Sequence, residues 1–175
     1  EGREPLVFQC SRHDDHMGSV ELAKQCLREG FKGVFAGPIH PGCKLMDHID
    51  GKVTIYLGEI SEQEKLAWCR RAFLFGLLHT WDTMPFSQSI IEAQGQGTPI
   101  YTRGVGPFLG TYLQHGHNGF EAGEQSLWTA YTAADVDMSY ASWAAARQYD
   151  VSVMIESFKT AFREIVAEWP RRNQP

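Results

Sequence analysis

The feature that most constrains this chain is a regular alternation of short apolar runs with helix-like segments. Apolar runs at residues 6–10, 32–36 and 53–57 are separated by more polar stretches. A fourth run, at 73–78, contains no polar residue, as expected of a strand that is covered on both faces. Strands that alternate with helices of ordinary length build parallel sheets. The sequence therefore predicts an α/β fold with a doubly wound parallel sheet.

Local start and stop signals place two helices between these strands. The segment Ser19–Glu29 carries its apolar residues on one helical face. Gly30 follows it and suits the left-handed conformation just past a helix end. Ser61 and Glu64 have the spacing of a capping box, in which each residue satisfies a free N–H group at the helix start. We expect one helix to end at Gly30 and another to begin at Ser61.

The second half of the chain continues the pattern and ends in helices. Apolar residues between 151 and 165 recur at the spacing of an amphipathic helix, so helices are expected over about 140–169. The intervening elements are expected to be a helix at 87–94, a strand at 99–102, a short helix near 109–114 and a short strand from Asn118.

Length and composition fit one domain spanning residues 1–175. The net charge of −5 argues against a nucleic-acid surface. No apolar run approaches the roughly 20 residues of a membrane-spanning helix, and the first residues have no signal-peptide pattern. None of the four cysteines forms a C-x-x-C pair. We therefore expect a cytoplasmic protein with reduced cysteines.

The segment 80–101 is the strongest functional candidate. This segment is predicted to form a loop, then a short helix that carries Glu92, and then a buried strand. The start of a helix is a natural anion site because its first N–H groups have no partner within the helix. Glu92, two turns further on, could reach a hydroxylated group beside such an anion. Phosphate plus diol is the outline of a nucleotide sugar. In a doubly wound sheet such a ligand binds at the carboxyl ends of the strands, here loops 11–18, 37–40, 58–61, 79–87 and 103–108.

Residues 84–119 resemble the C-terminal, nucleotide-sugar-binding domain of retaining glycosyltransferases of the GT-B fold, family four in particular. The matching positions are Pro85, Phe86, Ser89, Glu92, Ala93, Gly97, Pro99, Gly116, Asn118 and Gly119. Upstream, 11–18 takes the place of the family's basic loop, and 58–61 that of its base-binding loop. The resemblance implies a Rossmann-like domain that forms the C-terminal half of a GT-B fold.

The resemblance also implies roles for individual residues. Glu92 would bind the ribose hydroxyls, and Arg12 would neutralise the diphosphate through its bidentate guanidinium. Gly58 and Ile60 would frame the base. The loop and helix start at Pro85, Phe86, Ser87, Gln88 and Ser89 would offer N–H groups to phosphate or sugar. No metal and no cofactor is implied, since the nucleotide-diphosphate sugar is the substrate.

The sequence departs from the family at charged positions of this site. Met17 stands where the family has a lysine, and Met84 where it has an acid. Thr111 and Ser87 replace a glutamate and a glycine. Substitutes are available nearby: Asp82 or Thr83 for the acid, and His13, His16 or Arg103 for the cation. Alternatively, the donor has a different shape, or nucleotide binds weakly without catalysis. Arg12 and Asp82 are taken as the catalytic candidates.

Other interpretations of these residues remain open. Glu92 can also be an exposed helix glutamate, and Arg12 a surface arginine paired with Asp14. His13 and His16 resemble a metal site, but loop clusters of this kind are more often solvated.

The expected function is the donor-binding part of a retaining glycosyltransferase that needs a separate N-terminal acceptor-binding domain. The alternative is a catalytically degenerate pseudo-glycosyltransferase module that acts as a binding or scaffold domain. A third, weaker possibility is a sugar-phosphate epimerase of the same fold.

Overall fold

The computed structural model describes residues 3–80, 87–103, 113–123 and 125–172 of the chain. Its core is a sheet in which every neighbouring pair of strands is parallel, in the order β3-β2-β1-β4-β5-β6. The strands are β1 (Glu4–Cys10), β2 (Lys32–Ala36), β3 (Thr54–Tyr56), β4 (Ala72–Leu77), β5 (Ile100–Thr102) and β6 (Gly119–Glu121). The predicted doubly wound parallel sheet is confirmed.

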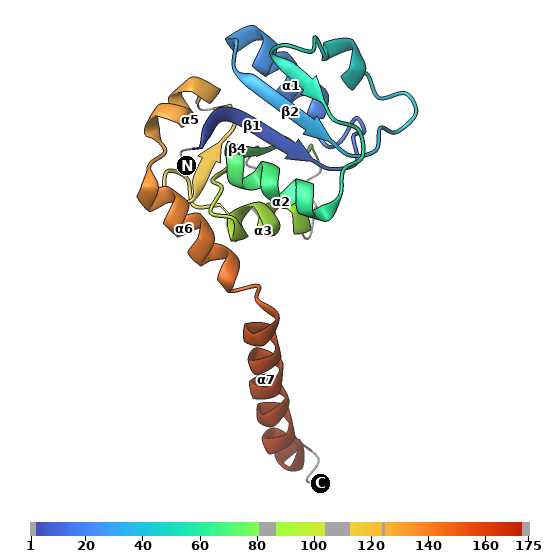
Figure 1. Ribbon diagram of the computed structural model, residues 1–175. Helices are drawn as coiled ribbons and strands as arrows, with labels where there is room; N and C mark the ends of the chain where they lie inside the picture. The colour runs from blue at the N-terminus through green and yellow to red at the C-terminus, as the bar shows by residue number, and fades with distance from the viewer. Residues whose placement is uncertain (1–2, 81–86, 104–112, 124, 173–175) are drawn as a thin grey trace.

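Helices cover both faces of the sheet (Figure 1). On one face lie α1 (Ser19–Glu29), the 3₁₀ turn η1 (Leu45–His48) and α5 (Leu127–Ala133). On the other lie α2 (Glu62–Arg71) and α3 (Gln88–Gly95), with α6 (Val136–Arg147) packed against α3. Successive strand side chains point to opposite faces. Val7 therefore packs under α1, while its neighbours Leu6 and Phe8 pack under α2 and α3.

The strand order fixes where a ligand can sit. The chain winds outward from β1 through β2 to β3, and then returns to place β4 on the other side of β1. The loops that leave β1 and β4 diverge to opposite faces at this point, which is where doubly wound sheets bind ligands. These are two of the five loops that the sequence singled out.

The structure confirms the predicted end of one helix at Gly30 and the predicted start of another at Ser61. Gly30 adopts a φ of 63° and its N–H caps the end of α1. Ser61 and Glu64 form both bonds of the capping box. The strand expected at 53–57 is shorter than predicted: β3 spans Thr54–Tyr56. The elements η1 and α5 were not anticipated. Most of the expected short helix near 109–114 lies outside the described residues.

A buried network around Arg3 was also not anticipated. Its guanidinium donates to the carbonyl oxygens of Cys69, Ala72 and Gln96, and to the hydroxyl of Thr98, over 2.7–3.1 Å. Arg3 thereby joins the start of the sheet to the end of α2 and to the turn between α3 and β5.

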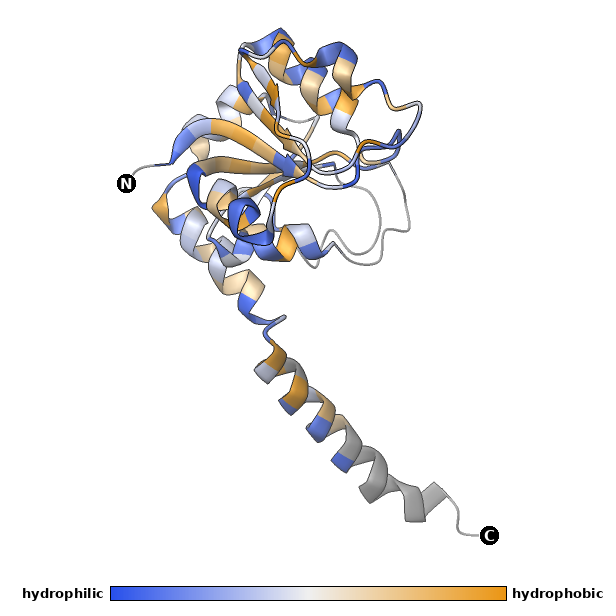
Figure 2. Ribbon diagram, turned by 45° about the vertical axis from the view of Figure 1, so that its right-hand side comes forward, coloured by the Kyte–Doolittle hydropathy of each residue, from blue (hydrophilic) through white to orange (hydrophobic). Residues whose placement is uncertain are grey.

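The last helix, α7 (Val151–Arg172), projects away from the body of the molecule (Figure 1). It confirms the expected C-terminal helix. Its side chains Val151, Ile155 and Phe158 are exposed. Apolar residues alternate with polar ones along its first turns (Figure 2). Within the described part of the chain, no helix combines the length and the apolar character needed to cross a bilayer.

Candidate functional site

The carboxyl ends of β1 and β4 are joined through their backbones. Gly18 has a φ of 68°, and a Cβ at this position would overlap the carbonyl oxygen of Leu78. The N–H of Thr80 donates to the carbonyl of His16 over 2.9 Å. The loop after β1 and the chain leaving β4 therefore form one rim at the point where the strand order reverses.

His13 fixes the same loop to β2. Its N–H donates to the carbonyl of Pro38 over 2.8 Å. Its buried ring lies 2.7 Å from the Ser19 hydroxyl through Nδ1 and 2.9 Å from the Ala36 carbonyl through Nε2. A carbonyl can only accept, so Nε2 carries the hydrogen and Nδ1 accepts from the hydroxyl. Burial lowers the pKa of His13 to about 4. His13 is therefore neutral near pH 7 and cannot supply the cation that is missing at Met17.

Both ring nitrogens of His13 are thus engaged within the protein, which leaves neither for a metal ion. Across the described ranges of the chain, no three or more histidine, cysteine or carboxylate side chains are grouped so as to hold one.

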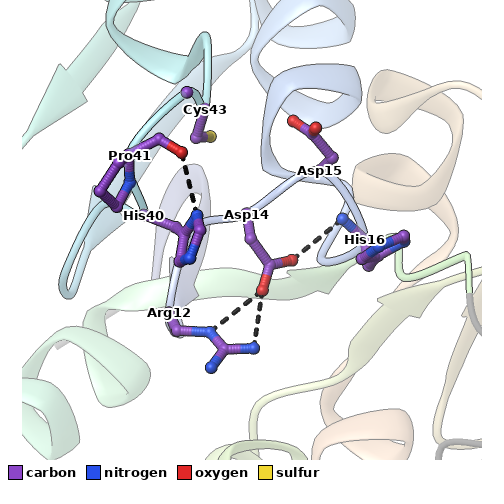
Figure 3. Close-up of a pocket in the computed structure, with 8 residues that line it drawn as sticks. Arg12, Asp14, Asp15, His16, His40, Pro41 and Cys43 are labelled. Carbon is purple, nitrogen blue, oxygen red and sulfur yellow. Dashed lines mark hydrogen bonds and ion pairs between the residues drawn. The ribbon is translucent and has the colours of Figure 1, made fainter.

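Arg12 stands at this rim with 59% of its side chain exposed. Its guanidinium contacts the Asp14 carboxylate from Nε at 3.0 Å and from Nη2 at 2.8 Å (Figure 3). Asp14 also accepts the N–H groups of His16 and Met17. Burial alone would raise the pKa of Asp14, but these bonds and the Arg12 charge outweigh it, and the pKa is lowered. Arg12 therefore pairs with Asp14, but the pair is not a fully exposed one, because only 10% of the Asp14 side chain is exposed.

A cavity of about 310 Å³ opens beside this pair (Figure 3). Its lining comes from the loops after β1 and β2: Arg12, Asp14, Asp15, His16, His40, Pro41, Gly42 and Cys43. A second cavity of about 290 Å³ shares Asp14 and Asp15 and is lined also by Thr80 and Arg103. The structure thus brings Arg103, which follows β5, to the same rim as the loop after β1.

Glu92 lies on the face covered by α2 and α3, where only 17% of its side chain is exposed. Lys65 of α2 places its ammonium 2.7 Å from Glu92 Oε2. Gln88, one turn earlier on α3, donates to Glu92 Oε1 over 2.7 Å. Glu92 is therefore not a freely exposed helix glutamate, because both of its oxygens are oriented by neighbouring side chains.

Solved structures share this architecture. A sucrose-phosphate synthase from Thermosynechococcus elongatus is 16% identical with a TM-score of 0.74 over 94% of this chain and 46% of its own. The Anabaena protein HepE in complex with UDP is 19% identical with a TM-score of 0.74 over 93% and 49%. A glycosyltransferase from Rickettsia africae is 16% identical with a TM-score of 0.75 over 95% and 49%. No family model and no curated protein matches the sequence.

The chain has the fold of one half of a GT-B glycosyltransferase. It spans about half the length of each of these structures. The Rossmann-like α/β prediction is thereby confirmed at the level of the fold.

The other predicted site residues of the GT-B half-domain fall into three groups. Ser87 is buried and caps α3 by accepting the N–H of Ile90 over 3.4 Å, while Ser89 is half-buried. Gly58 has a φ of 76°, and its carbonyl accepts the N–H of Gly37 over 2.8 Å. Ile60 packs against the apolar core. Asp82, Thr83, Met84, Pro85, Phe86 and Thr111 lie outside the described residues, so their roles stay predictions.

At position 17, where the sequence resemblance led us to expect a lysine, the chain makes an apolar contact. Met17 is half-buried and packs against the core under α2 and α3, as Ile60 and Ile91 do. The positive charge near Glu92 comes instead from Lys65. Sequence reasoning missed Lys65, because nothing in the pattern of α2 indicates that its side chain meets a residue of α3.

Proposed function

We propose that this chain is the donor-binding domain of a retaining glycosyltransferase and binds a nucleotide-diphosphate sugar. The proposal is supported by the fold of one half of a GT-B glycosyltransferase, in which Arg12 lies in the loop after β1 and Glu92, oriented by Lys65 and Gln88, lies on the helix that follows β4. The Anabaena protein HepE has been solved in complex with UDP and with UDP-glucose, and a pneumococcal O-GlcNAc transferase of similar fold in complex with UDP and GlcNAc.

Each ligand group has a proposed partner. The oriented Glu92 carboxylate accepts from the ribose hydroxyls, since a carboxylate oxygen has room for more than one bond. The loop and helix start over 85–89 give N–H groups to phosphate or sugar, and the backbone over 58–60 frames the base.

The diphosphate is assigned to Arg12. A guanidinium has five N–H donors, and the two contacts with Asp14 engage only part of them. Arg103 is the proposed second cation, because it lines a cavity on the same rim. Asp82 is the proposed replacement for the acid that the family has at position 84.

Transfer itself is assigned to a larger protein. Since this chain spans about half of its structural neighbours, we place the acceptor site on a further, N-terminal domain and the reaction in the cleft between the two. In this proposal the chain alone binds donor and transfers nothing, and the complete enzyme, in the cytoplasm, transfers sugar with retention and without an obligatory metal.

The direct test is calorimetric titration of the chain with UDP, GDP and ADP sugars. We expect one base to bind, and Glu92→Gln to weaken that binding about tenfold or more, as for the loss of a hydrogen bond to a charged group. Glu156→Gln is the matched control, because Glu156 also pairs with a lysine but lies on α7. The absence of heat with every donor at millimolar concentration would argue strongly against the proposal.

A degenerate binding module is the second candidate, and the apolar packing of Met17 favours it. The test restores charge at both departing positions with Met17→Lys and Met84→Glu. A marked gain in donor affinity indicates a site that has degenerated. Unchanged affinity with an unchanged melting temperature indicates a site that has been rewired.

A further inference from the structure

The contact between α2 and α3 places a lysine where the sequence pattern predicted none. Lys65 Nζ lies 2.7 Å from Glu92 Oε2 and 2.6 Å from Glu62 Oε2. Only 14% of the Lys65 side chain is exposed, against 62% for Glu62. Lys65 therefore has an inner partner, Glu92, and an outer partner that faces solvent.

The inner partner is held on two sides. Lys65 contacts one oxygen of Glu92, and the amide of Gln88 donates to the other over 2.7 Å. A carboxylate offers about four lone-pair sites, so two contacts fix its direction and leave acceptor capacity. Oε2 has almost no accessible surface, so the hydroxyl groups of a diol would be accepted at Oε1, whose direction Gln88 and Lys65 fix.

The pair also lies at the ligand-binding edge of the sheet. Cys10, the last residue of β1, lies near the charges of both Lys65 and Glu92. Burial raises the pKa of its thiol, Lys65 lowers it and Glu92 raises it. Cys10 and Ile91, the neighbour of Glu92 on α3, also pack in the same apolar cluster, which places the ion pair near the carboxyl end of β1.

We infer that Lys65 is a positioning residue that holds Glu92 to accept the hydroxyl groups of a ribose diol. This inference rests on the proposed function and adds to it the residue that sets discrimination for the sugar of the nucleotide. Lys65 acts through Glu92 and does not contact the reacting atoms.

The electrostatics of the site support this role. Burial lowers the pKa of Lys65, but the hydrogen bonds and charges of Glu62 and Glu92 outweigh burial and raise it. Lys65 therefore stays charged near neutral pH. Without Lys65, the half-buried Glu92 carboxylate would lose its ion-pair partner and one of the two contacts that orient it.

The experiment compares each nucleoside diphosphate with its 2′,3′-dideoxy counterpart. The 175-residue chain is titrated by calorimetry with UDP, GDP and ADP, and then with the dideoxy form of the one that binds. We expect the wild-type chain to prefer the diol by about tenfold or more, the size expected of bonds to a charged acceptor. We expect Lys65→Met to lose most of that preference while the dideoxy affinity stays unchanged.

Three variants separate positioning from simple stabilisation. Lys65→Arg keeps the charge and is expected to keep the preference. Glu62→Gln removes only the outer ion pair and is expected to leave the preference unchanged. The exchange of Lys65→Glu with Glu92→Lys keeps an ion pair but moves the carboxylate to α2. This exchanged pair is expected to have the melting temperature of the wild type but no preference for the diol. It therefore tests the positioning role of Lys65 even if Lys65→Met does not fold.

The possible failures are distinct. A wild-type chain that binds no nucleoside diphosphate overturns the proposed function and the inference with it. A wild-type chain that prefers the diol, with a Lys65→Met variant that prefers it equally, overturns the inference alone. Equal loss of affinity for both nucleotide forms in Lys65→Met also overturns it, since a positioning residue for the diol must act on the diol. An exchanged pair that discriminates like the wild type has the same consequence.

Discussion

His13 illustrates how one buried side chain sets the acid tolerance of this fold. Its folded pKa of about 4 lies below the ordinary value of 6.5, so the folded state favours the neutral ring. The associated stability is fully present above pH 6.5 and is lost as the pH falls toward 4, by up to roughly 3 kcal/mol in total. Urea unfolding between pH 7.5 and 4 measures this loss.

The control is His13→Gln, which removes the titrating group. We expect this variant to be less stable at pH 7, because the hydroxyl of Ser19 and the carbonyl of Ala36 lose their ring partner. Its stability should depend less on pH across the same window. An equal slope in both proteins would show that other groups control acid unfolding.

Arg12 gives a prediction specific to phosphate. Replacing it with Gln removes a charge from the rim beside the 310 Å³ cavity. We expect the affinity for the nucleoside diphosphate to fall about tenfold, while the uncharged nucleoside binds as before. Parallel titrations of both ligands measure the difference. Arg147→Gln, on the exposed end of α6, is the control that should change neither affinity.

The close backbone contact between the loop after β1 and the chain leaving β4 predicts how substitutions in this loop affect stability. Gly18→Ala introduces a Cβ that overlaps the Leu78 carbonyl. Gly30→Ala has a similar φ of 63° but meets no atom within 4 Å. We expect a loss of about 1–2 kcal/mol for Gly30→Ala from conformation alone. Gly18→Ala should cost roughly 3 kcal/mol or more, because the backbone must move. Chemical denaturation of both variants compares them.

Interactions between residues close in sequence could be predicted, whereas those between distant elements could not. Gly30 and the Ser61–Glu64 capping box act within a few residues, so their geometry could be predicted from the chain alone. Arg3 and Lys65 act across the fold, on residues of other elements that only tertiary packing brings near. The site was therefore predicted as a set of loops and a glutamate, whereas the contacts that orient this glutamate were not.

At the level of the complete chain, the doubly wound parallel sheet followed from the alternation of strands and helices, while the direction of α7 did not. The periodicity at 151–165 predicted an apolar stripe, and such a stripe normally packs on a body. Here Val151, Ile155 and Phe158 are exposed. The helix that carries them projects outward (Figure 2). Periodicity identifies a helix and its apolar face, but it does not specify what covers that face.

This arrangement predicts the effect of a truncation after Asp150. Since α7 projects from the body (Figure 1), removing residues 151–175 should leave the cooperative unfolding of the sheet intact. We expect the melting temperature to stay within about 3 °C, the shift that corresponds to roughly 1 kcal/mol in a domain of this size. A markedly lower melting temperature in calorimetry would mean that α7 stabilises the body.

The backbone joint between Gly18 and Leu78 has a consequence for how this domain can diverge. Because main-chain atoms form it, most exchanges of side chains along the two segments leave their relative placement unchanged. Met17, which directly precedes Gly18, can therefore occupy a position where the sequence resemblance predicted a lysine without displacing its surroundings. In this domain, backbone contacts set the placement of the two segments and side chains set the local charge. Substitutions can therefore change which ligand is preferred without moving the backbone.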